Sequence, residues 1–137
     1  MIKPTHKDLS MDNNDIHDVT VIGAGPAGLS IAYEIVRMGL KPLVLERTAA
    51  VGDVWRNHYD GVRLNSGRYF SALSGSKFPL SAGSWPSRED VVRLLETFPV
   101  RGGFAVQTNT DIEKINYDRH RDVWLITGTD GRHFESR

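Results

Sequence analysis

The pattern of hydrophobic and polar positions predicts a strand, a helix and a second strand at the start of the chain. A short run of β-branched residues over 18–22 stops at Gly23, and apolar residues then recur at the spacing of one helix face. Gly39 is suited to end this helix, because glycine readily adopts the left-handed conformation of a C-cap. A second apolar strand covers 42–46 and closes on Glu46. The apolar helical positions are Ile31, Ala32, Ile35 and Val36.

Farther along, the pattern predicts one more helix and several short strands. Ser87 and Asp90 have the spacing of a capping box, in which each side chain bonds the backbone N–H of the other residue. We expect this helix to end before Pro99, because the residue before a proline disfavours the helical conformation. Strands are predicted over 104–107 and, as an antiparallel meander, over 112–117, 123–127 and 132–135. The chain therefore predicts an α/β fold, with a Rossmann-like βαβ unit and parallel sheet followed by a β-meander.

The segment 52–87 shows neither the helical nor the strand periodicity of apolar residues over any sustained length. A long irregular segment in a compact domain is usually functional or disordered, and aromatic side chains argue against disorder. We expect this segment to wrap a ligand. Its aromatic residues are Trp55, Tyr59, Tyr69, Phe70, Phe78 and Trp85.

The glycines that follow the first strand have the spacing G-x-G-x-x-G. Gly23 allows a sharp turn off the strand, Gly25 lets the backbone approach a pyrophosphate, and Gly28 lets the helix lie close to its strand. The N–H groups of the first helical turn would then point at the phosphates, and Pro26 suits the helix start. A chance cluster of glycines in a loop is the alternative.

Glu46 strengthens the motif. An acidic residue about 20 positions beyond the glycines accepts hydrogen bonds from an adenosine ribose in dinucleotide-binding folds. Strand, glycine turn, helix, strand and acid occur here in that order. The sequence therefore predicts a dinucleotide site.

Composition narrows the possible partners. The chain has 137 residues with 17 basic and 17 acidic side chains, which argues against nucleic acid as the main partner. It has no cysteine, so disulfides and thiolate chemistry are excluded. The five histidines lack metal-ligand spacing, so no metal site is expected.

The same sequence predicts one domain behind a flexible tail. Residues 1–17 are polar and lack a signal-peptide core, so a cytoplasmic protein is the default. No apolar run approaches ~18 residues, so no membrane span is expected. Residues 18–137 form the expected domain, and its oligomeric state is left open.

Taken together, these motifs resemble the N-terminal part of the flavin-containing monooxygenases, an NADPH-dependent, single-component class of enzymes. The resemblance covers about residues 18–137. The glycine motif is shared by many flavoproteins, whereas the segment from Trp55 to Asn65 is more specific. The positions that carry the resemblance are Gly23-Ala24-Gly25-Pro26-Ala27-Gly28, Glu46, Gly52, Trp55, Arg56, Tyr59, Arg63, Asn65, Ser66, Phe78-Pro79 and Trp85-Pro86-Ser87.

The resemblance implies a role for each of these regions. The glycine turn would hold the FAD pyrophosphate, and Glu46, with Arg47 beside it, would bind the adenosine ribose. Trp55 and Arg56 would line the FAD beyond the ribose, and Ile112 falls where the family's backbone touches adenine. Trp55 could instead simply fill the core. The residues assigned to the turn are Gly23, Gly25, Pro26, Ala27 and Gly28.

Asn65 is the catalytic candidate that the resemblance supplies. It matches an asparagine beside the flavin ring in members that oxidise amines and sulfides, whereas Baeyer–Villiger members tend to carry aspartate there. Asn65 therefore favours oxygenation of nitrogen or sulfur over ketone oxidation. The alternative is an amide that only caps a loop.

The resemblance also implies the reaction and its cofactors. NADPH reduces FAD, and one atom of O₂ then passes to a nucleophilic nitrogen or sulfur of a small-molecule substrate. Family members are much longer and contain a second glycine motif for NADPH, which these residues lack. We therefore expect a partial FAD-binding domain, incomplete at its C-terminus. The alternatives are a non-catalytic FAD-binding remnant and a fragment of a pyridine-nucleotide-disulfide-type reductase that binds NAD.

One position departs from the family pattern. Members usually have two glycines before the tryptophan segment, whereas this chain has Asp53 after Gly52. A carboxylate beside a pyrophosphate would be repelled unless it points to solvent. We expect Asp53 to weaken FAD binding if it faces the cofactor.

Overall fold

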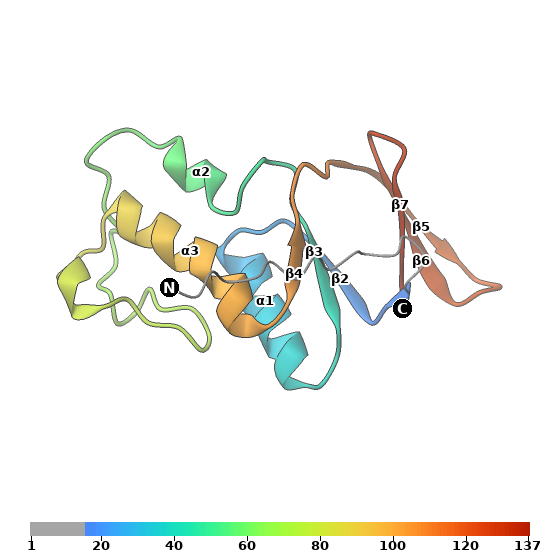
Figure 1. Cartoon of the computed structure of the whole chain (residues 1–137), viewed down its shortest axis with the longest axis horizontal. Coiled ribbons are helices and arrows are strands. Elements are labelled where there is room, and N and C mark those ends of the chain that lie inside the picture. The colour runs from blue at the N-terminus through green and yellow to red at the C-terminus, as the bar shows by residue number, and fades with distance from the viewer. Residues whose placement is uncertain (1–15) are drawn as a thin grey trace, which may run out of the picture.

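A three-stranded parallel sheet lies at the centre of the computed structural model, which describes residues 16–137. Helices α1 and α3 cover one of its faces (Figure 1). The predicted βαβ unit and parallel sheet are confirmed. The sheet order is β2 (Val19–Ile22), β3 (Pro42–Leu45) and β4 (Ala105–Gln107), with α1 (Pro26–Arg37) between the first two and α3 (Arg88–Gly102) before the third.

A second sheet covers the opposite face. Its three longer strands form the predicted antiparallel meander, namely β5 (Ile112–Asp118), β6 (Val123–Gly128) and β7 (His133–Ser136). The expectation of a loose tail through residue 17 is wrong at its end, because β1 (Ile16–His17) pairs in parallel with β7. That pairing joins residues more than 100 positions apart in the sequence, at the two ends of the described part, so no local pattern could reveal it. Residues 1–15 lie outside the described part.

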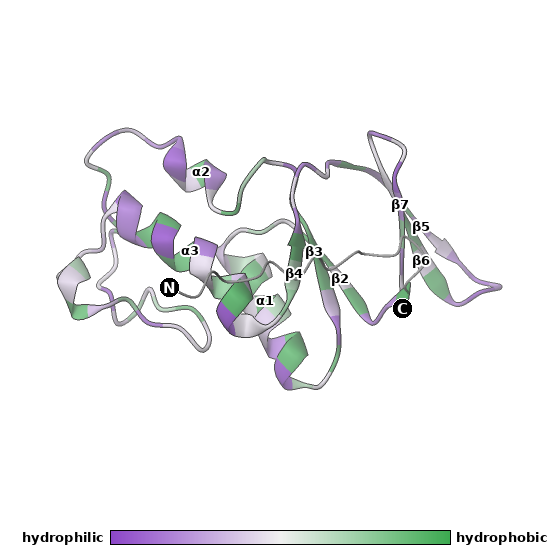
Figure 2. Ribbon diagram, in the orientation of Figure 1, coloured by the Kyte–Doolittle hydropathy of each residue, from purple (hydrophilic) through white to green (hydrophobic). Residues whose placement is uncertain are grey.

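Strand β3 is buried on both faces because it lies between the two layers. Val44 packs in the core cluster that contains residues of α1 and α3, whereas Leu43 and Leu45 pack against Ile126 and Phe134 of the meander. In Figure 2, hydrophobic colouring accordingly gathers around the parallel sheet, and the tip of the β5–β6 hairpin is hydrophilic. β3 therefore ends between two packed layers, and these layers fix the position at which Glu46 follows it.

Helix α3 begins as predicted but ends later than predicted. Ser87 and Asp90 form both hydrogen bonds of the capping box. The helix continues through Pro99 and ends at Gly102, where it is capped by Gly103 in the left-handed conformation with φ of 71°. Phe98 and Pro99 are buried, and this tertiary packing outweighs the helix hydrogen bond that a proline cannot donate.

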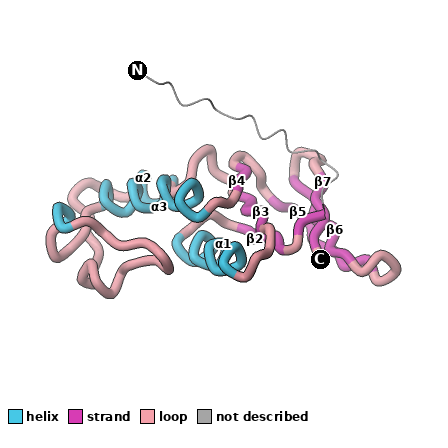
Figure 3. The backbone as a smooth tube through the Cα atoms, turned by 60° about the horizontal axis from the view of Figure 1, so that its bottom comes forward, coloured by secondary structure: helices cyan, strands magenta, loops and turns pink. Residues whose placement is uncertain are grey.

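The segment 52–87 is mostly irregular, as expected, and forms the loops at the far end of the molecule from the meander (Figure 3). It contains one helical turn, α2 (Asp53–Arg56), and a 3₁₀ turn over Leu80–Ala82. Phe78 and Ala82 anchor it in the helical core cluster. Within residues 16–137, no helix is long and apolar enough to cross a membrane.

Candidate functional site

The glycine turn lies at the carboxyl end of β2, where the chain enters α1. Gly23 has a φ of 99°, which side chains rarely tolerate, and its N–H donates to the Leu45 carbonyl oxygen at 2.7 Å. Pro26 occupies the start of α1, and Gly25 caps it with extended backbone. No side chain caps this end and no acidic residue lies in its first turn, so its N–H groups and positive dipole face outward.

The other two glycines of the motif have different surroundings. A Cβ on Gly28 would lie 2.0 Å from the Gly23 carbonyl oxygen, so close packing of the helix on the turn requires glycine there. A Cβ on Gly25 would meet no atom within 4 Å. Gly25 therefore leaves open space at the helix end, where a ligand's phosphates could approach the backbone.

Glu46 reaches this turn from the end of β3. Its Oε2 accepts a hydrogen bond from the Ala24 N–H at 2.7 Å. Its Oε1 accepts from the Thr48 N–H at 2.9 Å and from the Thr48 hydroxyl at 2.8 Å. A carboxylate can accept about four hydrogen bonds, so Oε2 keeps room for one more donor. The carboxylate is thus oriented beside the turn with acceptor capacity left for a sugar hydroxyl.

The hydrogen bonds also favour the ionised form of Glu46. Partial burial opposes ionisation, but the donors Thr48 and Ala24 outweigh it, with a smaller contribution from the charge of Arg47, and the pKa of Glu46 lies below its ordinary value. The group is therefore a carboxylate at neutral pH, which is the form that accepts hydrogen bonds from hydroxyls.

A cavity of about 140 Å³ joins the turn, Glu46 and α2. Pockets for whole ligands usually measure about 300–1,000 Å³, so this cavity corresponds to a part of a cofactor cleft. Thr48, Val54 and Leu95 also line it, and the sequence had not indicated these three as site residues. Thr48 follows Glu46 by two residues and could have been considered, whereas Leu95 arrives from α3 only through the fold. The lining residues are Ala24, Gly25, Pro26, Glu46, Thr48, Gly52, Asp53, Val54, Trp55 and Leu95.

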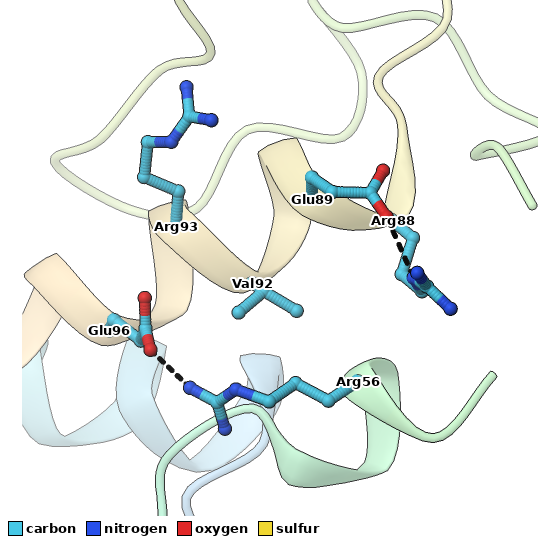
Figure 4. A pocket seen from close by; sticks show the side chains of 6 residues that line it. All are labelled: Arg56, Arg88, Glu89, Val92, Arg93 and Glu96. Carbon is cyan, nitrogen blue, oxygen red and sulfur yellow. Dashed lines mark hydrogen bonds and ion pairs between the residues drawn. The ribbon is translucent and has the colours of Figure 1, made fainter. Parts of the chain in front are cut away.

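The remaining predicted residues divide between this cavity and other places. Trp55 lines the cavity and also packs against the core. Arg56 turns toward α3, and its guanidinium lines a second cavity (Figure 4). Arg47 is exposed beside Glu46, and Ile112 packs against the core cluster under the meander. Asn65 is exposed on the irregular segment and does not line the first cavity.

Comparison with known proteins identifies the class. Residues 18–120 match the model of the family described as FAD dependent oxidoreductase. The chain belongs to this family. This match confirms the expectations of FAD as the cofactor and of a Rossmann-like FAD-binding fold. The resemblance to flavin monooxygenases is confirmed by the relatives described next.

Several relatives of the chain are monooxygenases. Indole-3-pyruvate monooxygenase YUCCA8 of Oryza sativa is 31% identical over 110 residues, which are 80% of this chain and 26% of that protein. A CzcO-like oxidoreductase of Geobacillus kaustophilus is 28% identical over 118 residues, which are 86% of this chain and 33% of that protein. The chain thus spans about a third or less of the curated relatives that it matches.

Solved structures agree on the fold. The flavin-containing monooxygenase of Stenotrophomonas maltophilia superposes with a TM-score of 0.79 at 27% identity, over 90% of this chain and 37% of that one. The bacillithiol disulfide reductase of Staphylococcus aureus superposes with a TM-score of 0.76 at 21% identity, over 90% of this chain and 36% of that one, and shows a shared fold alone.

The residues of the glycine turn fit the adenosine diphosphate half of FAD. Open space beside Gly25 and the uncapped start of α1 suit the pyrophosphate. The remaining acceptor site on Glu46 suits a ribose hydroxyl, and apolar Val54, Trp55 and Leu95 provide walls. Only Asp53, a second carboxylate on the same cavity, is unexpected for an anionic ligand.

Proposed function

We propose that this chain binds the adenosine diphosphate half of FAD and serves an NADPH-dependent monooxygenase that oxygenates nucleophilic nitrogen or sulfur. The observation that carries the proposal is the hydrogen bond of 2.7 Å from Ala24 N–H to Glu46 Oε2, which places the carboxylate at the mouth of the glycine turn. This arrangement supports the predicted roles of the glycine turn and of Glu46.

Each group has a defined task in binding. The first turn of α1 compensates the charge of the pyrophosphate with its N–H groups and dipole, and Gly25 permits the close approach. Glu46 orients the ribose by accepting from a hydroxyl, and Thr48 holds Glu46 in place. FAD, when bound, supplies the electron transfer and oxygen chemistry, which no side chain of this chain provides.

Titration of FAD into the purified 137-residue chain tests the binding step. We expect saturable quenching of flavin fluorescence at a 1:1 ratio and competition by ADP, because ADP carries the groups that this site would recognise. NAD serves as the rival ligand. Tighter binding of NAD than of FAD would favour the alternative of a reductase fragment, and no binding of either would overturn the proposal.

A chimera tests the oxygenation step. In it, this chain replaces the matched part of the Stenotrophomonas maltophilia flavin-containing monooxygenase, whose remainder supplies the rest of the enzyme. We expect NADPH consumption coupled to oxidation of a thioether or a tertiary amine. Conversion of a cyclic ketone to a lactone instead would contradict the nitrogen or sulfur assignment that rests on Asn65.

A second candidate is an FAD-binding module that performs no turnover by itself. It is favoured by the single glycine motif in these 137 residues, since NADPH would need a site of its own. We expect FAD bound to the isolated chain to stay oxidised when NADPH is added without oxygen. Bleaching of the flavin absorbance under these conditions would contradict this candidate.

A further inference from the structure

Helix α2 separates two cavities and presents a different charge to each. Asp53 lines the cavity of the glycine turn, together with Gly25 and Glu46. Arg56, three residues later, lines a neighbouring cavity of about 310 Å³ between α2 and α3. Figure 4 shows the Arg56 guanidinium in this second cavity, directed at Glu96 of α3. The single turn of α2 thus carries an acidic residue that lines the first cavity and a basic residue that lines the second.

Arg56 is fixed by three acceptors. Its Nη1 donates to Asp53 Oδ1 at 2.8 Å and to the Val51 carbonyl oxygen at 3.0 Å, and its Nη2 donates to the Glu96 carboxylate. The side chains of Arg56 and Asp53 are 30% and 24% exposed, so this pair is partly shielded from water. Shielded pairs are screened less by salt than surface pairs. The Arg56 charge therefore acts on Asp53 at short range.

The charge of Asp53 opposes the ligand that the cavity is built for. A pyrophosphate carries negative charge, and like charges close together in a partly shielded site repel each other. Arg56 offsets this repulsion because it pairs with the same carboxylate and does not itself line this cavity. Removing Arg56 would leave Asp53 uncompensated at the cleft.

We infer that Arg56 sets the affinity of the cleft for FAD by neutralising Asp53, without itself touching the cofactor. This inference rests on the proposed function, because it concerns the same FAD site. Arg56 is a positioning and charge-balancing residue, and Glu96 holds it against α3. The rival account is that Arg56 contacts FAD directly, as the family resemblance implied.

A double-mutant cycle separates the two accounts. FAD dissociation constants are measured by fluorescence for the wild type, Asp53→Asn, Arg56→Gln and the double variant, at low and high salt. We expect Arg56→Gln to weaken binding about 3- to 10-fold at low salt, in line with one charge pair, and less at high salt. Asp53→Asn should bind FAD at least as tightly as the wild type. In the Asp53→Asn background, Arg56→Gln should change the affinity by less than about twofold.

Two further variants serve as controls. Arg56→Lys keeps the charge and should bind FAD nearly as the wild type does. Arg121→Gln removes a comparable pair with Glu135 on the meander, far from the cleft, and should leave FAD affinity unchanged. Circular dichroism and thermal unfolding identify any variant that fails to fold. If Arg56→Gln does not fold, the FAD affinity of Asp53→Asn tests the inference alone. Weaker FAD binding by Asp53→Asn than by the wild type would overturn it.

The outcomes also distinguish the inference from the proposed function. An equal loss of affinity from Arg56→Gln in both backgrounds would show direct contact with FAD and overturn the inference, while the FAD site would stand. Unchanged affinity in Arg56→Gln would overturn it as well. A wild-type chain that binds no FAD would overturn the proposed function, and the inference with it.

Discussion

The Glu46 carboxylate accepts the Ala24 N–H at 2.7 Å and so joins the end of β3 to the glycine turn after β2. The two residues are brought together because β2 and β3 are paired in parallel, with Ile22 opposite Leu45. The carboxyl ends of parallel strands meet at one edge of the sheet, where such folds bind their ligands.

Replacing Glu46 by Gln should weaken FAD binding about 10- to 100-fold, because a charge-assisted acceptor is lost. The amide would also turn an N–H group toward the donors Ala24 and Thr48. Titration with FAD measures the loss. Glu113→Gln, on the exposed part of β5, is the matched control and should bind as the wild type does. Equal affinity in the two variants would contradict a ribose-binding role for Glu46.

The lowered pKa of Glu46 predicts an acid-sensitive contribution to folding stability. A carboxylate whose pKa is lower in the folded state contributes its full stabilisation of the fold at pH values above its unfolded-state pKa. This contribution is lost as the pH falls through the folded-state pKa. Urea unfolding of the wild type and Glu46→Gln over a pH series measures it. We expect the wild type to lose more stability in acid than the variant does. A pH-independent difference between them would contradict this prediction.

Gly25 and Gly28 should respond differently to added side chains. Gly25→Val should abolish FAD binding, by about 100-fold or more, since its side chain would occupy the open space for the phosphates. Its stability should change by about 1 kcal/mol or less, the usual scale for a helix N-cap.

Gly28→Ala is the counterpart of that change. Its Cβ would meet the Gly23 carbonyl oxygen, so we expect a loss of unfolding free energy at the upper end of roughly 1–3 kcal/mol. Thermal unfolding without FAD separates the two variants. A destabilised Gly25→Val beside a stable Gly28→Ala would contradict the assignment.

Thr48 should act on the cofactor only through Glu46. Thr48→Val removes the hydroxyl that donates to Oε1 and should weaken FAD binding about 3- to 10-fold, the scale of one ordinary hydrogen bond, because the Thr48 N–H still holds the carboxylate. Thr48→Ser keeps the hydroxyl and is the matched control. In a Glu46→Gln background, Thr48→Val should have little further effect on the FAD dissociation constant. A full additional loss there would indicate a separate contact with FAD.

The capping box should stabilise α3 measurably. Ser87→Ala removes the acceptor of the Asp90 N–H and should cost about 1 kcal/mol of unfolding free energy. Ser81→Ala, at an exposed position of the 3₁₀ turn, is the control and should change stability little. Denaturant unfolding measures both. A loss in Ser81→Ala as large as in Ser87→Ala would contradict a specific cap.

The elements that the sequence predicted correctly depend on interactions between near neighbours. The glycine turn at Gly23, the left-handed Gly39 that follows the C-cap of α1, and the capping box of Ser87 and Asp90 are formed by residues a few positions apart. The turns between the meander strands are equally local. Short-range backbone preferences therefore determined this part of the fold, along with the class of ligand.

What only the tertiary structure decided involves residues that are distant in the chain. Because Phe98 and Pro99 are buried in the core, α3 extends beyond the end that the sequence predicted. Ile16 and His17 form a strand because they pair with β7. The sequence suggested that Asp53 would oppose FAD, but the contact of Arg56 with Glu96, 40 residues away, depends on how α2 lies against α3. Such contacts depend on the way hydrophobic burial stacks the helices and sheets, because no interaction between near neighbours favours them.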